Sequence, residues 1–156
     1  MRTNILALFL LSGCSSAINW MGEASTLAAV PLQCPEAEIV TEQTSGFTFD
    51  SVGCGKAIRQ SCRDRTCTPI GEVESADRYT SLSERALTVR TQLDRRGADV
   101  VQGCGGGAPV TLKILIAADG TFQRIYAETN LAECLTRTVG RLAPGNAPLL
   151  FTHTFQ

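Results

Sequence analysis

The chain lacks several features that would point to a functional class. Its 156 residues carry 14 basic and 15 acidic side chains, so no charge excess indicates binding to nucleic acid. A single histidine, His153, and the absence of any C-x-x-C pair disfavour a zinc site and a thioredoxin-type redox pair. No apolar run approaches the roughly 20 residues that span a bilayer. With 44% hydrophobic residues, the composition predicts an ordinary globular domain.

The cysteine content and the first residues together predict export from the cytoplasm. Seven cysteines are many for this length, which favours an oxidising compartment. Arg2 gives a positive start, and Ile5–Leu11 is an apolar stretch typical of an export signal. The stretch ends in Leu-Ser-Gly-Cys, with the cysteine at position 14. This ending resembles the lipobox of bacterial lipoproteins, in which small residues fit the peptidase and the cysteine thiolate takes up a diacylglycerol.

The resemblance implies a lipid anchor on Cys14 after removal of a signal peptide of residues 1–13, with a further acyl chain on the freed amine. Residues 14–33 are expected to form a flexible tether reaching roughly 20–25 Å from the membrane. Within it, Trp20 and its neighbours touch either the membrane interface or the protein surface. Ser15, rather than aspartate, follows the cysteine, so we expect the outer membrane of a Gram-negative bacterium, facing the periplasm or the cell surface. The alternative is an ordinary secretory signal with an incidental cysteine.

If Cys14 carries the lipid, an even number of cysteines is left to form disulfides, as a disulfide framework requires. The six are Cys34, Cys54, Cys62, Cys67, Cys104 and Cys134. Residues 34–76 contain short β-type runs with too little apolar material for a core, so disulfides are expected to substitute for one. If residues 34–40 fold back on 47–54, Cys34 meets Cys54 and Cys62 is left to close a short loop with Cys67. Fifteen connectivities are possible in principle.

Residues 77–156 show a different pattern. Ser81–Glu84 reads as a capping box that begins a helix of about 15 residues, which Gly97 is expected to stop. Two β-type runs, 110–117 and 121–127, flank Asp119-Gly120, a strong hairpin signal. The predicted register places these residues opposite each other: Ile114 and Ile125, Leu112 and Ala127, Lys113 and Tyr126. One face of the hairpin is apolar and requires a helix to cover it.

A second helix, with its own capping pattern at Asn130, is expected to supply that cover. Its apolar stripe consists of Leu131, Cys134, Leu135, Val139 and Leu142, and a last strand follows over 149–155. Cys104 lies six residues before Val110 in a glycine-rich run that imposes little steric restriction. We therefore predict a Cys104–Cys134 disulfide. In the contrary case, Cys134 is a buried free thiol and Cys104 pairs with a cysteine of residues 34–76.

The order helix, hairpin, helix, strand resembles the C-terminal domain of TonB-type proteins. The matching pieces are VTLKILIAADGTFQRIYAE, the helix LAECLTRTVGRL, a proline and the final strand FTHTFQ. The resemblance covers about half of the chain and implies an α+β fold, with a small antiparallel sheet packed by two helices and preceded by the disulfide-rich β module. The basic surface of energy transducers is absent, so coupling to an inner-membrane motor is not expected.

No catalytic constellation emerges from the remaining residues. Gly103–Gly107 lacks the Gly-Lys-Ser/Thr of a phosphate loop and precedes a strand. His153 lacks a Gly-x-Ser-x-Gly partner and is expected to be a packed or edge histidine. Scattered acids, Asp64, Glu72, Glu74 and Asp77, are expected to form a solvated surface. We expect a non-catalytic lipoprotein that binds another envelope component through its sheet edge or hairpin module, without cofactor, metal or small-molecule ligand. The alternative is a thiol-redox or hydrolytic periplasmic enzyme that uses the Cys54–Cys67 region.

Overall fold

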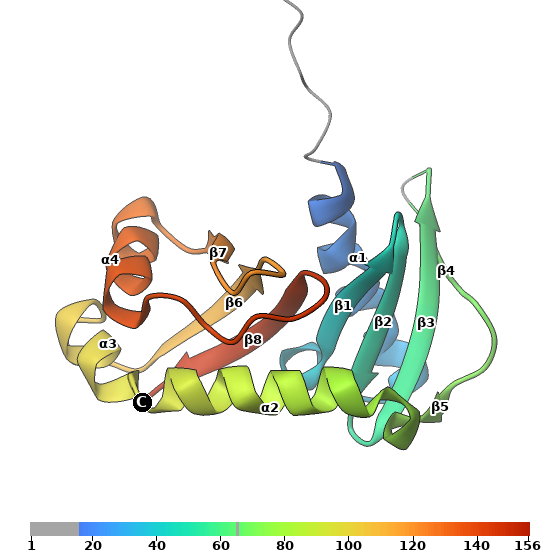
Figure 1. Ribbon diagram of the computed structural model, residues 1–156, viewed down its shortest axis with the longest axis horizontal. Coiled ribbons are helices and arrows are strands. Elements are labelled where there is room, and N and C mark those ends of the chain that lie inside the picture. The colour runs from blue at the N-terminus through green and yellow to red at the C-terminus, as the bar shows by residue number, and fades with distance from the viewer. Residues whose placement is uncertain (1–15, 65) are drawn as a thin grey trace, which may run out of the picture.

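The computed structural model describes residues 16–64 and 66–156, so the predicted signal peptide and Cys14 lie outside the described residues. The fold is α+β, as predicted, with an eight-stranded antiparallel sheet that carries helices on both faces (Figure 1). The strands are β1 (Val40–Ser45), β2 (Thr48–Gly53), β3 (Lys56–Arg63), β4 (Thr66–Pro69), β5 (Glu74–Ser75), β6 (Val110–Ile116), β7 (Phe122–Tyr126) and β8 (Leu149–Phe155). The α-helices are α1 (Ser16–Leu32), α2 (Thr80–Asp94), α3 (Gly97–Gly103) and α4 (Thr129–Val139), and two short 3-10 turns are η1 (Glu36–Glu38) and η2 (Ala76–Tyr79).

One sheet runs through both of the segments that the sequence suggested as separate modules. The strand order is β4-β3-β2-β1-β8-β6-β7, and β5 pairs with β3. The two halves meet where β1 pairs with β8, through Thr41 opposite Leu150 and Glu42 opposite Leu149. The Gln43 N–H extends this seam by donating to the Pro148 carbonyl at 3.2 Å. Residues 34–76 therefore do not rely on disulfides alone, because they share a sheet and its core with the C-terminal half.

Side chains alternate along the strands, and different helices cover the two faces of the sheet. Ile114 and Ile116 belong to the cluster that packs against α2, α3 and α4. Leu115, between them, lies in the cluster that packs against α1. The same alternation in β8 places Phe151 and Phe155 in the first cluster and Leu150 in the second. The sheet is therefore the middle layer between α1 and the three other α-helices.

Helix α1 differs from the flexible tether that the sequence suggested for residues 14–33. Between Ser16 and Leu32 the chain is helical and packs on β1, β2, β3 and β4. Its fully buried residues recur at helical spacing: Met21, Ala24, Ala28 and Leu32. The small residues of the stripe let the helix approach the sheet closely. Met21 thus contacts the protein itself rather than a membrane.

The predicted helix, hairpin, helix and strand of the C-terminal half are present as α2, β6–β7, α4 and β8. The hairpin register is confirmed for Lys113 opposite Tyr126 and Ile114 opposite Ile125. The apolar side of the hairpin lies in the cluster covered by the helices. Leu135 of α4 and Leu93 of α2 are both fully buried there.

Local details of this half differ from the predictions at the ends of elements. The predicted capping box does not form, since α2 begins at Thr80 and Tyr79 makes no side-chain cap bond. Helix α2 has the predicted 15 residues and ends at Asp94, before Gly97, which begins the separate helix α3. Helix α4 ends at Val139, three residues before the expected Leu142.

The β6–β7 turn is wider than the two residues Asp119-Gly120 that the sequence marks as the hairpin turn, and the β6–β7 ladder ends before the predicted pair of Leu112 with Ala127. The turn is closed by the Ala117 N–H, which donates to the Thr121 carbonyl at 2.8 Å. Gly120 has φ +86°, and a Cβ there would lie 2.1 Å from the Leu142 carbonyl oxygen. Only glycine therefore permits the chain after α4 to approach this turn.

The six described cysteines form the three disulfides favoured by the sequence. Cys34–Cys54, Cys62–Cys67 and Cys104–Cys134 have Cα–Cα distances of 5.6, 3.9 and 5.7 Å. The third joins the end of α3 to α4. In the chain-entropy model, closing its loop contributes about 3–4 kcal/mol. It holds together the two short helices that cover the C-terminal half of the sheet.

The packing of α1 predicts unequal effects for two substitutions on this helix. Met21→Ala is expected to lower the free energy of unfolding by about 2–4 kcal/mol, because it leaves a cavity beside Phe49 and Leu150. Val30, 83% exposed on the same helix, is the matched control, and Val30→Ala should change stability by less than about 0.5 kcal/mol. Chemical denaturation of both variants measures the difference. Equal, small effects would contradict the packing of α1.

Candidate functional site

Strand β7 is the last strand at one edge of the sheet and pairs, within the described residues, only with β6. Its ladder places Arg124 opposite Leu115 and Phe122 opposite Ile116, so Gln123 is the extra residue of a β-bulge. Edge strands present alternate N–H and C=O groups away from the sheet. The outer side of β7 can therefore hydrogen-bond an extended segment, over a short stretch on either side of the bulge.

A groove of about 460 Å³ separates this edge strand from helix α4. Its apolar part is formed by Phe122 and Ile125 of β7, both half-buried, and by Ala132 of α4. Its polar lining consists of Gln123, Arg124, Thr129, Glu133, Thr136 and Arg137. The combination of an open backbone edge, an apolar floor and a polar rim is typical of sites that bind extended peptides.

The described residues of the groove carry charges of both signs. Arg137 and Glu133 belong to the α4 wall, whereas Arg124 pairs in the ladder with Leu115, whose side chain lies on the α1 face of the sheet. The Arg124 guanidinium carbon lies 5.0 Å from the centroid of the Tyr126 ring, which orients it along the strand. An acidic side chain in a bound segment would therefore meet Arg137 on the α4 wall of the groove.

The loops around the groove are held by interactions distant from it in sequence. The Arg85 guanidinium of α2 donates to the Ala147 carbonyl, to the Ala117 carbonyl at 3.3 Å and to Glu42 Oε1 at 3.1 Å. It thereby ties the β6–β7 turn and the chain before β8 to strand β1. Asp119 accepts from the Thr121 hydroxyl and N–H, which lowers the pKa of Asp119. The turn that precedes β7 is thus hydrogen-bonded to α2.

A second, charged cavity of about 390 Å³ lies between β1–β3 and the start of α2. Arg59 donates to both carboxylate oxygens of Asp50, at 2.7 and 2.8 Å, and this pairing raises the pKa of Arg59. Burial raises the pKa of Glu42 despite its ion pair with Arg85. The most buried charged groups here, Asp50 and Glu42, already pair with Arg59 and Arg85. We therefore interpret the cavity as part of the packing between α2 and the sheet, not as a ligand site.

The scattered acids are mostly on the surface, as expected. Asp64, Glu72 and Asp77 are exposed, whereas Glu74 is half-buried and pairs with Arg78 at 3.2 Å. They do not line the groove beside β7.

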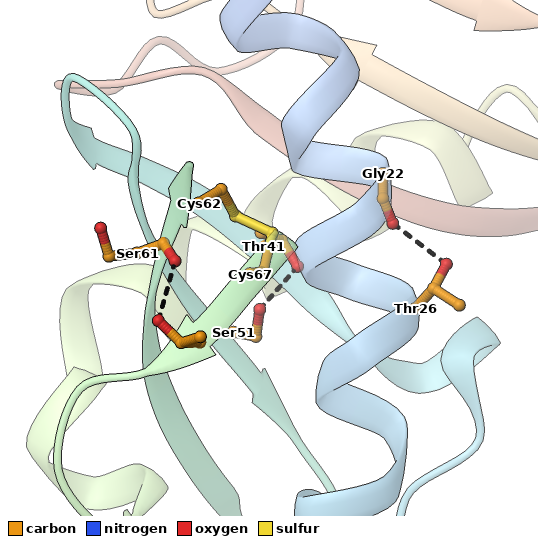
Figure 2. Close-up of a disulfide and its surroundings, with 8 residues drawn as sticks. Gly22, Thr26, Thr41, Ser51, Ser61, Cys62 and Cys67 are labelled. Atoms are coloured by element: carbon orange, nitrogen blue, oxygen red, sulfur yellow. Dashed lines mark hydrogen bonds between the residues drawn. A yellow bond between two sulfur atoms is a disulfide. The ribbon is translucent and has the colours of Figure 1, made fainter. Parts of the chain in front are cut away.

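The Cys54–Cys67 region, the alternative site, is constrained by its disulfides. Figure 2 shows the Cys62–Cys67 bridge beneath helix α1, beside the buried Thr41–Ser51 hydrogen bond of 2.9 Å. Cys62 is fully buried and Cys67 is 7% exposed, so a redox partner has little access to the sulfur atoms.

One group of possible metal ligands occurs among the described residues. Cys34, Glu38 and Cys54 have ligand atoms within 4.8 Å of one another. Both sulfur atoms belong to a disulfide, which removes the thiolates that a metal requires.

The Gly103–Gly107 run ends helix α3 instead of forming a phosphate cradle. The N–H of Cys104 donates to the Val100 carbonyl at 2.8 Å, and the N–H of Gly107 donates to the Val101 carbonyl at 2.9 Å. These amides already satisfy the last carbonyls of the helix. The run positions Cys104 opposite α4, as the sequence analysis expected.

His153 is a packed histidine on β8 and lies apart from the groove. It is 6% exposed, and its ring meets the Phe155 ring edge-on at a centroid distance of 4.7 Å. Its Nε2 is 3.5 Å from Asp94 Oδ1 but makes no hydrogen bond. Burial lowers the pKa of His153, and the attraction of Asp94 only partly offsets this.

The lowered pKa predicts a pH dependence of stability. Between the unfolded pKa of about 6.5 and the lower folded pKa, the unfolded chain binds the proton more readily. The free energy of unfolding should therefore fall as the pH decreases from about 7 to about 5. His153→Gln should remove this part of the slope in denaturation measured across that range. If stability depends on pH with the same slope in the wild type and in His153→Gln, the pKa of His153 is the same in the folded and unfolded chains and the prediction is wrong.

The sequence predicts binding through a sheet edge or the hairpin module but does not identify the groove residues. No sequence motif marks Phe122, Ile125 and Ala132. The only signal is that the amphipathic helix follows the hairpin closely, which suggests that the helix and the hairpin are neighbours in the fold. No helix among the described residues is both long and apolar enough to cross a membrane. No protein-family model, curated protein or solved structure matches the chain.

Proposed function

We propose that this protein is a non-catalytic lipoprotein of the bacterial outer membrane that binds an extended segment of another envelope protein in the groove between β7 and α4. The observation that carries the binding role is the open edge of β7 beside the apolar floor of Phe122 and Ile125. The Leu-Ser-Gly-Cys sequence at residues 11–14 supports the anchor. Three disulfides agree with an oxidising compartment such as the periplasm.

We further propose that residues 77–156 are a divergent TonB C-terminal-like domain. The order of α2, the β6–β7 hairpin, α4 and β8 supports this assignment. Two features set this chain apart: helix α3 is inserted before β6, and β8 pairs with β1 on the side away from β6. Partner binding is therefore assigned to the β7 edge.

The groove defines the chemistry of the partner. Backbone pairing with β7 requires an extended segment, and the bulge at Gln123 limits the continuous pairing to a few residues. Phe122 and Ile125 favour an apolar side chain on the groove side of that segment. Arg137, exposed on the α4 wall, favours an acidic residue near that apolar side chain.

Lipid anchoring is tested at the cysteine itself. Cys14→Ala removes the thiol that accepts the diacylglycerol, so the full-length chain should lose acyl labelling and remain uncleaved by the lipoprotein peptidase. Cys104→Ala is the control, because it removes another sulfur and should retain the label. Acyl labelling that persists in Cys14→Ala would contradict the anchor.

Partner binding is tested by cross-linking from the groove in intact envelopes. A photoreactive residue at exposed Gln123 should give one discrete protein adduct, while the same residue at Leu87, 68% exposed on α2, should not. Ala132→Arg fills the groove and should reduce the adduct by roughly tenfold, the effect of about 1.4 kcal/mol. Ala98→Arg, at an exposed position of α3, should not.

Two outcomes would contradict the proposed groove. One is an adduct from Gln123 that Ala132→Arg does not reduce. The other is the same adduct from Leu87. Circular dichroism of each variant verifies that a lost adduct reflects a blocked groove and not an unfolded chain.

A further inference from the structure

Helix α1 begins at the end of the sheet where the β3–β4 hairpin turns (Figure 1). Trp20, in the second turn of this helix, lines a depression of about 420 Å³ together with Phe47, Cys62, Arg63 and Asp64. Phe47 lies in the β1–β2 turn and is 43% exposed, and Trp20 is half-buried. Two aromatic side chains therefore share the end of the molecule from which α1 starts.

Covalent geometry links this end to the proposed anchor. Ser16 follows Cys14 by two residues, which span at most about 7 Å. Trp20 is four residues further along the helix, or about 6 Å at the rise of an α-helix. A lipid on Cys14 would thus place the bilayer surface within about 13 Å of Trp20. Because α1 is packed on the sheet, Ser15 is the one residue between the proposed anchor and this helix.

The side chains at this end suit the headgroup layer. Tryptophan is enriched at the membrane–water interface, where its ring lies at the headgroup level. Arg63, exposed beside the two aromatic residues, is suited to lipid phosphates. The polar tips of the hairpins exclude deep insertion, since Asp64 is exposed at the same end.

The flank of α1 offers a different way to lie on a membrane. Leu27 and Val30 are exposed there, at 40% and 83%. The same flank also exposes Glu23 and Thr26, and the Thr26 hydroxyl donates to Glu36 at 3.0 Å. An acidic, hydrogen-bonded flank is a poor match for a membrane surface, so the end of the helix is favoured over its side.

We infer that the protein stands on the membrane by the end that carries Trp20, Phe47 and Arg63, with these side chains in the phospholipid headgroup layer and α1 pointing away from the bilayer. This inference rests on the proposed anchor at Cys14. It replaces the flexible tether with a fixed orientation of the sheet relative to the membrane.

The only tryptophan of the chain makes the orientation measurable without introducing a probe. The mature chain, residues 14–156, contains every described residue and, with three disulfides formed, a single free thiol at Cys14. Coupling this thiol to a maleimide phospholipid in phosphatidylethanolamine–phosphatidylglycerol vesicles imposes the anchor chemically. Acyl groups brominated near the headgroups should quench Trp20 emission by roughly twofold, and acyl groups brominated near the bilayer centre should quench it less.

The matched control moves the tryptophan along the same helix. In a Trp20→Phe, Val30→Trp variant the probe lies ten residues, about 15 Å, further from the anchor and should not be quenched. An unquenched Trp20, or equal quenching at both positions, would overturn the inferred orientation. Because the coupling supplies the lipid, these results do not depend on lipidation in the cell, which the mass of the envelope-purified chain tests separately.

Discussion

The pairing of β1 with β8 is the constraint on which the rest of the structure depends. Only two residue pairs form it, Thr41 with Leu150 and Glu42 with Leu149, yet it converts two incomplete halves into one sheet. Helices stabilise this pairing from both faces of the sheet. Helix α1 packs against Leu150, and the Arg85 guanidinium of α2 donates to Glu42 Oε1 at 3.1 Å. Without it, residues 34–76 would be a small hairpin assembly with little core of its own.

The seam also determines which surfaces are available. It occupies the side of β8 away from β6, so the open edge in this half of the sheet is β7. Helix α1 packs mainly on β1 to β4, which places Trp20 near its start beside Phe47 of the β1–β2 turn and Arg63 at the end of β3. A single sheet thus connects the proposed membrane-facing end to the proposed binding groove. The orientation of the protein on the membrane therefore limits the directions from which a partner can reach the groove.

What the sequence could predict was local. The Asp119-Gly120 turn and the helical spacing from Leu82 to Leu93 follow from neighbouring residues, and the disulfide pairings follow from the expected hairpins and from the helix expected to cover the sheet. The β1–β8 pairing could not be predicted. Thr41 and Leu150 are far apart in the sequence, and no local pattern indicates that these two strands are neighbours in the sheet. The packing of α1 depends on the same long-range arrangement, although the spacing of its buried residues was a readable signal. The groove needed both the edge position of β7 and the placement of α4.

Backbone amide hydrogen exchange of the intact protein tests this account most directly. Peptides that cover residues 40–43 and 149–151 should be protected to the same extent as the β2–β3 pair, whereas the outward amides of β7 should exchange much faster. Seam peptides that exchange as fast as exposed loops, while β2–β3 and β6–β8 stay protected, would show two independent units and would contradict the single sheet.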